Sequence, residues 1–310
     1  KKRIYYRDLM KKYAAIDIGS NAIRLLIVSV LSNNLLKQYR KINLVRVPIR
    51  LGGDVFIDNK ISKNKSNQLI YALKSFKILM EINKVDKYKI CATSAMREAS
   101  NSKKIINAVY DKLKLNINII TGKEEASVIA NVFIKDYNHY NNLLYVDVGG
   151  GSPELTIINK GNIIASKSFK IGTVRMLNNL INENIWLEYK NWIKDNTESY
   201  DNISIIASGG NANKLLKISK KKIAEPISIS LLKEIYKDLK MHSFEERVLK
   251  LNLNPDRADV IIPATQIYLR SMKFSNSKQI IIPRIGLADG IIRKIDSNKN
   301  YGDKLSKQKD

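Results

Sequence analysis

Two stretches of the chain share one pattern of apolar and polar positions. Residues 13–30 read YAAIDIGSNAIRLLIVSV, and residues 143–158 read LLYVDVGGGSPELTII. In each stretch an apolar run ends in Asp, one apolar residue and Gly, and a small polar turn then leads into a second apolar run. β-branched residues around such a turn predict a β-hairpin. The repetition predicts two similar halves that face each other across a cleft.

The remaining periodicity predicts strands and helices in the same order after each hairpin. Further strands are expected over residues 41–49, 88–93, 117–120, 163–169, 203–207 and 279–282. Apolar residues at helical spacing predict helices over residues 61–83, 95–113, 121–135, 173–180, 186–197, 229–239, 257–272 and 286–295. Gly161 and Asn162 are expected to form a tight turn between two strands of the second half.

A length of 310 residues suits two domains better than one. We therefore expect an α/β protein with an N-terminal domain over residues 10–124 and a C-terminal domain over residues 125–296. The tail at residues 297–310 is polar and lysine-rich, so disorder is expected there. Residues 1–9 are expected to be dispensable, with Met10 as a candidate start of the native chain.

Cysteine and histidine usage excludes several classes of protein. Cys91 is the only cysteine, so an internal disulfide is excluded and a reduced cytoplasm is expected. His139 and His242 are the only histidines and neither lies in a ligand pattern, which excludes a histidine–cysteine zinc site. No apolar stretch approaches the ~18 residues of a membrane span. A secretory signal is not expected either.

The formal net charge is +25, and such a charge attracts polyanions. Compositional bias is the simpler explanation, because the lysines are spread along the chain rather than clustered with aromatic residues. Selection for a polyanionic partner remains the alternative. A nucleic-acid partner would be motivated by the charge alone, and we do not favour it.

The second hairpin contains the densest run of glycine. Gly149, Gly150 and Gly151 follow Asp147 and precede Ser152. Consecutive glycines let backbone N–H groups turn toward an anion, which can approach closely because no Cβ is in the way. A turn without a ligand is the alternative, but it does not need three glycines. We interpret this run as an anion-binding turn.

The first hairpin has a counterpart, in which Ser20 and Asn21 offer donors and Arg24 a charge. Alone it is a common turn, and its pairing with the second copy favours a functional reading. Both turns join a strand to a strand, whereas a dinucleotide site joins a strand to a helix and carries a G-x-G-x-x-G run. A dinucleotide site is therefore not expected, and no Walker A sequence is present.

Thr93 and Ser94 place two hydroxyl groups at a predicted helix start, with Arg97 one turn further on. Helix amides, hydroxyl groups and a guanidinium together suit an oxyanion. An N-cap with a solvated arginine is the alternative.

Glu124 and Glu125 lie at the next helix start, where carboxylates are favoured electrostatically. The functional alternative is a base that orients water for attack on phosphorus. Gly209 and Gly210 follow a strand and could close the far side of a cleft.

Taken together, these segments resemble the exopolyphosphatase and guanosine pentaphosphate (pppGpp) phosphohydrolase family. The resemblance runs from about residue 13 to residue 293 in family order. It rests on the segments AAIDIGSNAIRLLI, CATSAMREASN, ITGKEEASVI, YVDVGGGSPELTI, SFKIGTVRM, IIASGGNANKL, RADVIIPATQIYL and IGLADGII.

The resemblance implies the actin-like ATPase fold, with two duplicated ribonuclease-H-like domains and an interdomain cleft. It implies a hydrolase that releases terminal orthophosphate from inorganic polyphosphate, from pppGpp or from both. It further implies Mg²⁺ as cofactor, a cytoplasmic enzyme and a homodimer.

Roles are also implied residue by residue. Glu125 is expected to be the general base, with Asp147 and Glu154 as catalytic carboxylates that bind the metal. The resemblance implies that phosphate is bound by Asp17, Ser20, Asn21, Arg24, Thr93, Ser94, Arg97, Gly149, Gly150, Gly151, Ser152, Gly209 and Gly210.

Two departures from the family pattern keep alternatives open. The family turn reads GGGST, and Pro153 stands in place of the Thr. Long family members carry a further helical region, so this shorter chain is expected to favour short polyphosphates or pppGpp. The alternatives are a polyphosphate- or alarmone-binding protein without turnover and an ATP-using kinase or chaperone of the same fold.

Proline at position 153 removes a backbone N–H and a hydroxyl group, and so up to two phosphate donors. We predict that Pro153→Thr raises kcat/KM on polyphosphate, measured as phosphate release. An unchanged or lower value would contradict this prediction.

Overall fold

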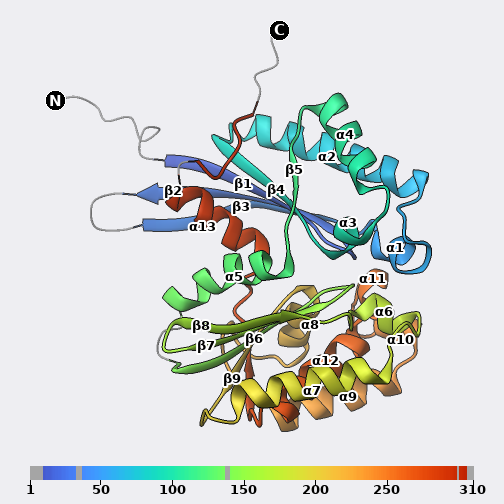
Figure 1. The fold of residues 1–310 in the computed structure, drawn as a ribbon, viewed down its shortest axis with the longest axis vertical. Coiled ribbons are helices and arrows are strands. Elements are labelled where there is room, and N and C mark those ends of the chain that lie inside the picture. The colour runs from blue at the N-terminus through green and yellow to red at the C-terminus, as the bar shows by residue number, and fades with distance from the viewer. Residues whose placement is uncertain (1–9, 33–36, 137–139, 299, 306–310) are drawn as a thin grey trace, which may run out of the picture. The chain divides into compact units, whose positions relative to one another are not determined.

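The computed structural model describes residues 10–32, 37–136, 140–298 and 300–305. The chain forms two compact units (Figure 1). Unit 1 contains Lys1–Thr121 and Leu287–Asp310, and unit 2 contains Gly122–Gly286. Residues 1–9, which were expected to be dispensable, and His139 lie outside the described residues.

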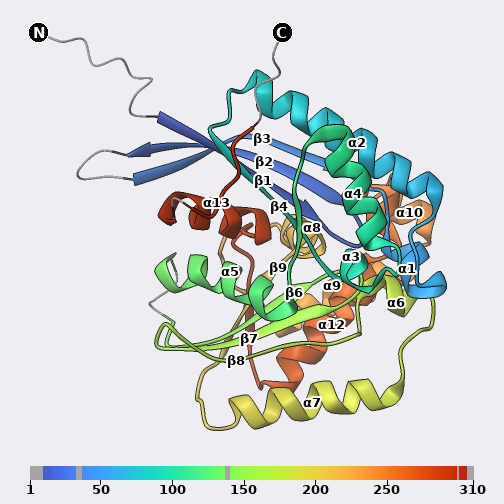
Figure 2. The ribbon, with the colours of Figure 1, turned by 45° about the horizontal axis from the view of Figure 1, so that its top comes forward.

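Unit 1 is built on a five-stranded sheet in the order β3 (Lys37–Val47), β2 (Ile23–Ser32), β1 (Met10–Ile18), β4 (Lys87–Ala92) and β5 (Ile117–Ile119). Strands β1, β2 and β3 are antiparallel neighbours, whereas β4 and β5 run parallel to β1. Helices α2 (Lys63–Ile82) and α4 (Ser102–Leu113) cover one face, and α13 (Leu287–Ser297) covers the other (Figures 1 and 2). The short helices α1 (Gly52–Asp58) and α3 (Ser94–Glu98) complete the unit.

Unit 2 repeats this strand order as β8 (Asn162–Ser168), β7 (Pro153–Asn159), β6 (Asn142–Val148), β9 (Ser204–Ser208) and β11 (Gln279–Ile281), with β10 (Ile227–Ser228) added at the edge. Again the hairpin strands are antiparallel and the next two are parallel. The predicted duplication is confirmed. The helices are α5 (Gly122–Asp136), α6 (Thr173–Leu177), α7 (Glu183–Thr197), α8 (Gly210–Ile218), α9 (Ile229–Met241), α10 (Phe244–Leu249), α11 (Pro255–Ala258) and α12 (Ile261–Phe274).

Each unit has its own apolar core. Buried side chains of β1, β2 and β4 pack with those of α2 and α4 in unit 1, and buried side chains of β6, β7 and β9 pack with those of α8, α9 and α12 in unit 2. Of the helices that the structure describes, none is both long and apolar enough to cross a bilayer.

The two predicted hairpins are present and close in the same way. Gly19 donates its amide to the Ala22 carbonyl at 3.1 Å, and Gly149 donates its amide to the Ser152 carbonyl at 2.9 Å. Each hairpin therefore has a four-residue turn directly after its first strand, which is β1 in unit 1 and β6 in unit 2.

The predicted helix over residues 95–113 is wrong in one respect, because it is two helices, α3 and α4. Between them, Ala99 is extended and Asn101 turns its side chain to a distant segment. The Asn101 amide accepts a hydrogen bond from the Ile61 N–H at 3.0 Å and donates one to the Ile61 carbonyl at 2.8 Å. These contacts compete with a continuous helix.

Two smaller expectations also differ from the structure. The predicted helix over residues 257–272 is divided into α11 and α12. The tight turn of the second half lies at Lys160 and Gly161, which have φ of 46° and 79°, so that Asn162 already belongs to β8. Positive φ at both central residues is the geometry of a two-residue hairpin turn.

The division into units differs from the predicted domain boundaries at both ends. Unit 2 begins at Gly122, and α13 belongs to unit 1 rather than to the second half. Helix α13 is fixed to β3 by an ion pair of 2.7 Å from Lys41 to Asp289 and by a hydrogen bond of 2.6 Å from the Tyr39 hydroxyl to Asp296.

The tail predicted to be disordered is structured in part. Asp303 and Tyr88 exchange backbone hydrogen bonds of 2.8 and 2.9 Å, which add an antiparallel bridge beside β4. Residues 299 and 306–310 lie outside the described residues.

We predict that Asn101→Ala lowers the free energy of unfolding by about 1–3 kcal/mol, because it leaves the N–H and the carbonyl of Ile61 without partners. Asn107→Ala is the matched control, since Asn107 is an exposed residue of α4, the helix that follows Asn101. Urea unfolding measures both. Equal losses for the two variants would contradict the role given to Asn101.

Candidate functional site

The glycine turn of unit 2 is held by the start of α6. The carbonyl groups of Gly149, Gly150 and Gly151 accept hydrogen bonds from the amides of Thr173, Val174 and Gly172 at 3.1, 2.9 and 3.0 Å, respectively. The buried Arg175 adds a bond of 2.9 Å from Nε to the Gly151 carbonyl. All three carbonyl groups of the turn are therefore directed to α6.

The amides of the same turn have no such partners. Those of Gly150, Gly151 and Ser152 donate to no acceptor in the part of the chain that the structure describes. All three residues are buried. Amide groups of a glycine turn that have no protein acceptor are available to a bound anion, as expected for an oxyanion site.

Two acidic residues flank this turn. Asp147, at the end of β6, pairs in register with Glu154 at the start of β7. Like charges directly opposite each other on a sheet are destabilising. In unit 1 the corresponding pair is Asp17 and Arg24, which carry opposite charges. The second hairpin thus has two facing acids where the first has an acid that faces a base.

Glu154 is oriented by two hydroxyl groups. Its Oε1 accepts hydrogen bonds from Ser152 Oγ at 2.5 Å and from Ser168 Oγ at 3.1 Å. The Ser152 hydroxyl is therefore bonded to Glu154. Of the predicted phosphate donors of Ser152, only its backbone amide remains for an anion.

Glu125 lies in the first turn of α5 and is 7% exposed. Burial raises the pKa of the Tyr145 phenol well above its ordinary value, and the carboxylates of Asp147 and Glu125 raise it further. The start of α5 lies beside β8, because a Cβ at Gly122 would lie 2.9 Å from Ser168 Cβ, and Ser168 donates to Glu154. Asp147 pairs in register with Glu154 at the end of β6.

The strand beside β6 contributes Gly209 and Gly210. Gly209 has a φ of 99°, and a Cβ there would lie 3.0 Å from Asp147 Oδ1. A Cβ at Gly210 would lie 2.1 Å from Nη2 of the buried Arg257. The φ of Gly209 favours glycine, and the backbone at Gly209 and Gly210 passes directly beside Asp147 and Arg257.

The first turn is arranged in the same way within unit 1. The carbonyl groups of Ser20 and Asn21 accept hydrogen bonds from the amides of Gly52 and Arg50 at 2.8 and 3.0 Å. As in unit 2, the segment at the start of a short helix fixes the carbonyl side of the turn.

Asp17 and Arg24 form an ion pair of 3.0 Å. Burial raises the pKa of the Asp17 carboxyl group, and the Arg24 charge acts in the opposite direction. Arg24 is partly exposed, so its charge remains accessible to an anion.

The predicted phosphate donors of α3 meet the first turn. The hydroxyl groups of Ser20 and Ser94 lie 2.7 Å apart, and the amide of Thr93 donates to the Ile18 carbonyl at 3.1 Å. Arg97 donates from Nη1 to the Ile120 carbonyl at 2.7 Å. Unit 1 thus gathers its predicted residues at the end of β1.

Asp147 and Glu154 were also predicted to bind a metal. Mg²⁺ binds through one or two carboxylates while it keeps waters and takes phosphate oxygens. Among the described residues, no group of three or more His, Cys, Asp or Glu side chains could hold a metal ion. The facing pair therefore fits a cation whose coordination the substrate completes, rather than a closed protein cage.

Sequence reasoning assigned no role to Gly172, Arg175 or Arg257. All three residues lie in segments that carry the family resemblance, and that resemblance is the signal that could have pointed to them. Their contacts with the glycine turn and with Gly210 depend on residues far away in the sequence, so a local pattern could not reveal them.

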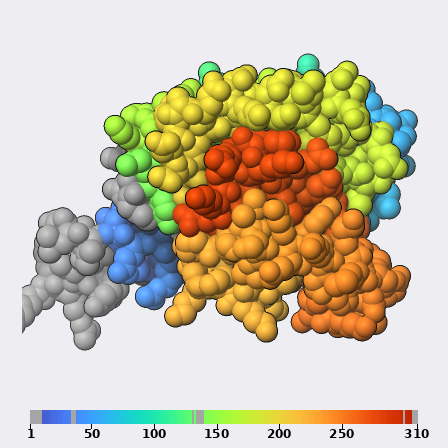
Figure 3. Space-filling model, turned by 90° about the horizontal axis from the view of Figure 1, so that it is seen from below, coloured from blue at the N-terminus to red at the C-terminus, as the bar shows by residue number. Residues whose placement is uncertain are grey.

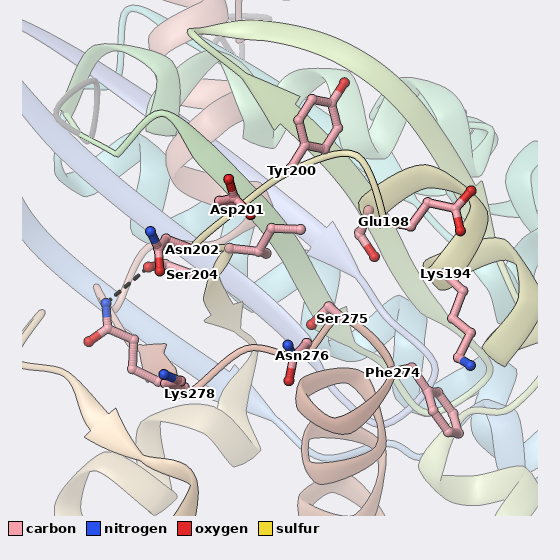
Figure 4. A pocket seen from close by; sticks show the side chains of 13 residues that line it. Lys194, Glu198, Tyr200, Asp201, Asn202, Ser204, Phe274, Ser275, Asn276 and Lys278 are labelled. Atoms are coloured by element: carbon pink, nitrogen blue, oxygen red, sulfur yellow. Dashed lines mark hydrogen bonds between the residues drawn. The ribbon is translucent and has the colours of Figure 1, made fainter.

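Unit 2 also has a pocket of about 740 Å³ at the opposite ends of its parallel strands (Figure 4). It is lined by Ser204 and Gln279, the first residues of β9 and β11, and by charges of both signs, including Lys194 and Glu198. The yellow segment near residue 200 and the red segment near residue 280 adjoin on one face (Figure 3). No predicted site residue lines this pocket.

A model described as the Ppx/GppA phosphatase family matches residues 40–298. This span is most of the chain, and the protein belongs to the Ppx/GppA phosphatase family. The family predicted from the motifs is confirmed.

Two curated relatives match parts of this sequence. The bifunctional 3-dehydroquinate synthase/phosphatase of Fusobacterium nucleatum is 31% identical over 296 residues, which cover 87% of this chain and 44% of the relative. The guanosine-5'-triphosphate,3'-diphosphate pyrophosphatase of Aeromonas hydrophila is 28% identical over 167 residues, which cover 54% of this chain and 33% of the relative. The chain spans less than half the length of these relatives.

Solved structures agree on the fold. An exopolyphosphatase from Cytophaga hutchinsonii has a TM-score of 0.81 at 20% identity, covering 94% of this chain and 100% of that chain. The Aquifex aeolicus member of the Ppx/GppA family has a TM-score of 0.74 at 21% identity, covering 94% and 99%. Together with the repeated strand order, these likenesses confirm the predicted duplicated α/β fold.

The support of the glycine turn gives a direct test. A Cβ at Gly172 would lie 2.2 Å from the Gly150 carbonyl oxygen and 2.2 Å from the Gly151 carbonyl carbon, so Gly172→Ala must displace the turn. We predict a loss of about 1–3 kcal/mol in the free energy of unfolding.

Gly286→Ala is the matched control, because a Cβ at Gly286 would meet nothing within 4 Å. Thermal unfolding of both variants measures the difference. A Gly172→Ala protein as stable as the Gly286→Ala protein would contradict the close approach described here.

Proposed function

We propose that the protein is a phosphohydrolase that releases terminal orthophosphate from inorganic polyphosphate, from pppGpp or from both. The observation that carries the proposal is the glycine turn, whose buried amides have no acceptor among the described residues and which lies between the Asp147 and Glu154 carboxylates. Such amides suit phosphate oxygens, and two facing carboxylates suit the cation that accompanies them.

Phosphoryl transfer needs mainly positioning and neutralisation of charge. In this proposal, the amides of Gly150, Gly151 and Ser152 bind the terminal phosphate. Asp147 and Glu154 would hold Mg²⁺, and the ion would neutralise charge on the phosphate oxygens. Glu154 is kept in place for this by Ser152 and Ser168.

Glu125 is the proposed general base. It is buried, and it lies in unit 2 with the glycine turn. In a solution near neutral pH, a carboxylate can accept a proton from a water molecule while that water attacks phosphorus. The residues of unit 1 named above are proposed to contribute binding of phosphate, through Arg24, Arg97 and the hydroxyl groups of Ser20, Thr93 and Ser94.

The names of the relatives support the choice of substrate. A guanosine-5'-triphosphate,3'-diphosphate pyrophosphatase and an exopolyphosphatase are both similar to this chain. The alternative is a polyphosphate- or alarmone-binding protein without turnover, and Pro153 in the turn favours it. Phosphate release on short polyphosphate, long polyphosphate and pppGpp, each with Mg²⁺ and with a chelator, separates the two. If the protein binds all three substrates but releases phosphate from none of them, the proposal that it is a hydrolase is wrong.

A homodimer in a reduced cytoplasm remains the proposed setting, supported by the family resemblance and by the single buried Cys91. Sedimentation of the purified protein tests the oligomeric state.

We predict that Glu125→Ala lowers kcat at least 100-fold and leaves the affinity for substrate nearly unchanged, because general bases contribute about 10²–10⁴-fold. Glu124→Ala is the matched control, since Glu124 is an exposed acid in the same helical turn. Single-turnover phosphate release and calorimetric binding provide the two measurements. Retention of most of the turnover in Glu125→Ala would refute the assignment.

A further inference from the structure

Behind the candidate catalytic carboxylates, unit 2 contains a set of buried hydroxyl groups to which no role has been given. Tyr145 on β6 and Tyr268 on α12 are both fully buried. The Tyr145 hydroxyl lies 2.5 Å from Ser208 Oγ, and the Tyr268 hydroxyl donates to the Ser208 carbonyl at 2.6 Å. Ser208 is thus held at its side chain and at its backbone by two different tyrosines.

The position of Ser208 connects these two hydrogen bonds to Asp147 and to Gly209. It pairs in register with Asp147 across the parallel strands β6 and β9. The next residue, Gly209, has a φ of 99°, and its backbone approaches Asp147 Oδ1 so closely that a Cβ would lie 3.0 Å away. Movement of the backbone after Ser208 would therefore displace either Gly209 or the Asp147 carboxylate.

Tyr145 also lies on the same face of β6 as Asp147, two residues before it, because side chains alternate along a strand. The Tyr145 phenol therefore shares a face of β6 with the proposed metal-binding acid, and it is hydrogen-bonded to the residue that precedes Gly209.

We propose that Tyr145, Ser208 and Tyr268 form a positioning network that fixes the Asp147 carboxylate and the Gly209 backbone in the geometry that catalysis requires. This inference rests on the proposed function for its kinetic part. None of the three side chains needs to touch the substrate. The network acts through Asp147 and Gly209, so its loss misplaces catalytic groups without removing a binding contact.

The test compares Tyr145→Phe with Tyr189→Phe. Tyr189 is also fully buried, and its hydroxyl lies 2.6 Å from Ser271 Oγ on α12, so both variants lose one buried tyrosine–serine hydrogen bond. We expect similar losses of thermal stability. Only Tyr145→Phe should lower kcat, by about tenfold or more, with KM nearly unchanged, because small misplacements of catalytic groups are costly.

Ser208→Ala provides an internal check. It removes the same hydrogen bond from the other side, so the double variant Tyr145→Phe/Ser208→Ala should lose no more kcat than the worse single variant. Tyr268→Phe should lower kcat further in the Tyr145→Phe background, because it releases the Ser208 carbonyl instead. Additive losses for Tyr145→Phe and Ser208→Ala would overturn the network.

A second measurement keeps the inference independent of turnover. Hydrogen exchange of the backbone over residues 205–212 should be faster in Tyr145→Phe and in Tyr268→Phe than in Tyr189→Phe. If the wild-type protein releases no phosphate, the proposed function fails while this comparison still decides the positioning role. Equal exchange in all three variants, or a kcat of Tyr145→Phe within twofold of Tyr189→Phe, would overturn the proposal.

Discussion

The candidate site depends on how the glycine turn of unit 2 distributes its hydrogen bonds. The start of α6 takes all three glycine carbonyl groups, so the peptide planes cannot rotate freely. Once the carbonyl oxygens are fixed on one side, the amides are directed away from α6 and stay unpaired among the described residues. Other parts of unit 2 support this turn. Strands β6 and β7 place the two flanking acids, and Gly172 allows α6 to approach the turn closely.

The two duplicated hairpins have the same backbone arrangement but differ in the charges of their facing side chains. Both have the same turn closure and the same support from a short helix segment. The position opposite the leading aspartate decides the difference, since Arg24 neutralises Asp17 whereas Glu154 adds charge to Asp147. The two hairpins therefore differ in the charge of one pair of facing strand positions.

The sequence predicted the features that depend on near neighbours in the chain. The two hairpins follow from alternation and glycine runs, and the family follows from the motifs. What it missed depends on contacts between distant residues. The break at Asn101 needs Ile61, the support of the turn needs Gly172 and Arg175, and the Ser152 hydroxyl is directed to Glu154 by Ser168 and the strand pairing. No local pattern contains that information.

The return of α13 to unit 1 has a consequence for the order of folding. The chain leaves unit 1 after Thr121 and re-enters it at Leu287, so helix α13 reaches the first sheet only after unit 2 has been made. During synthesis, unit 2 can close as an uninterrupted segment while the first sheet is still without α13. Unit 1 begins before unit 2 and is completed after it, so its nascent form is the one that most needs protection from aggregation.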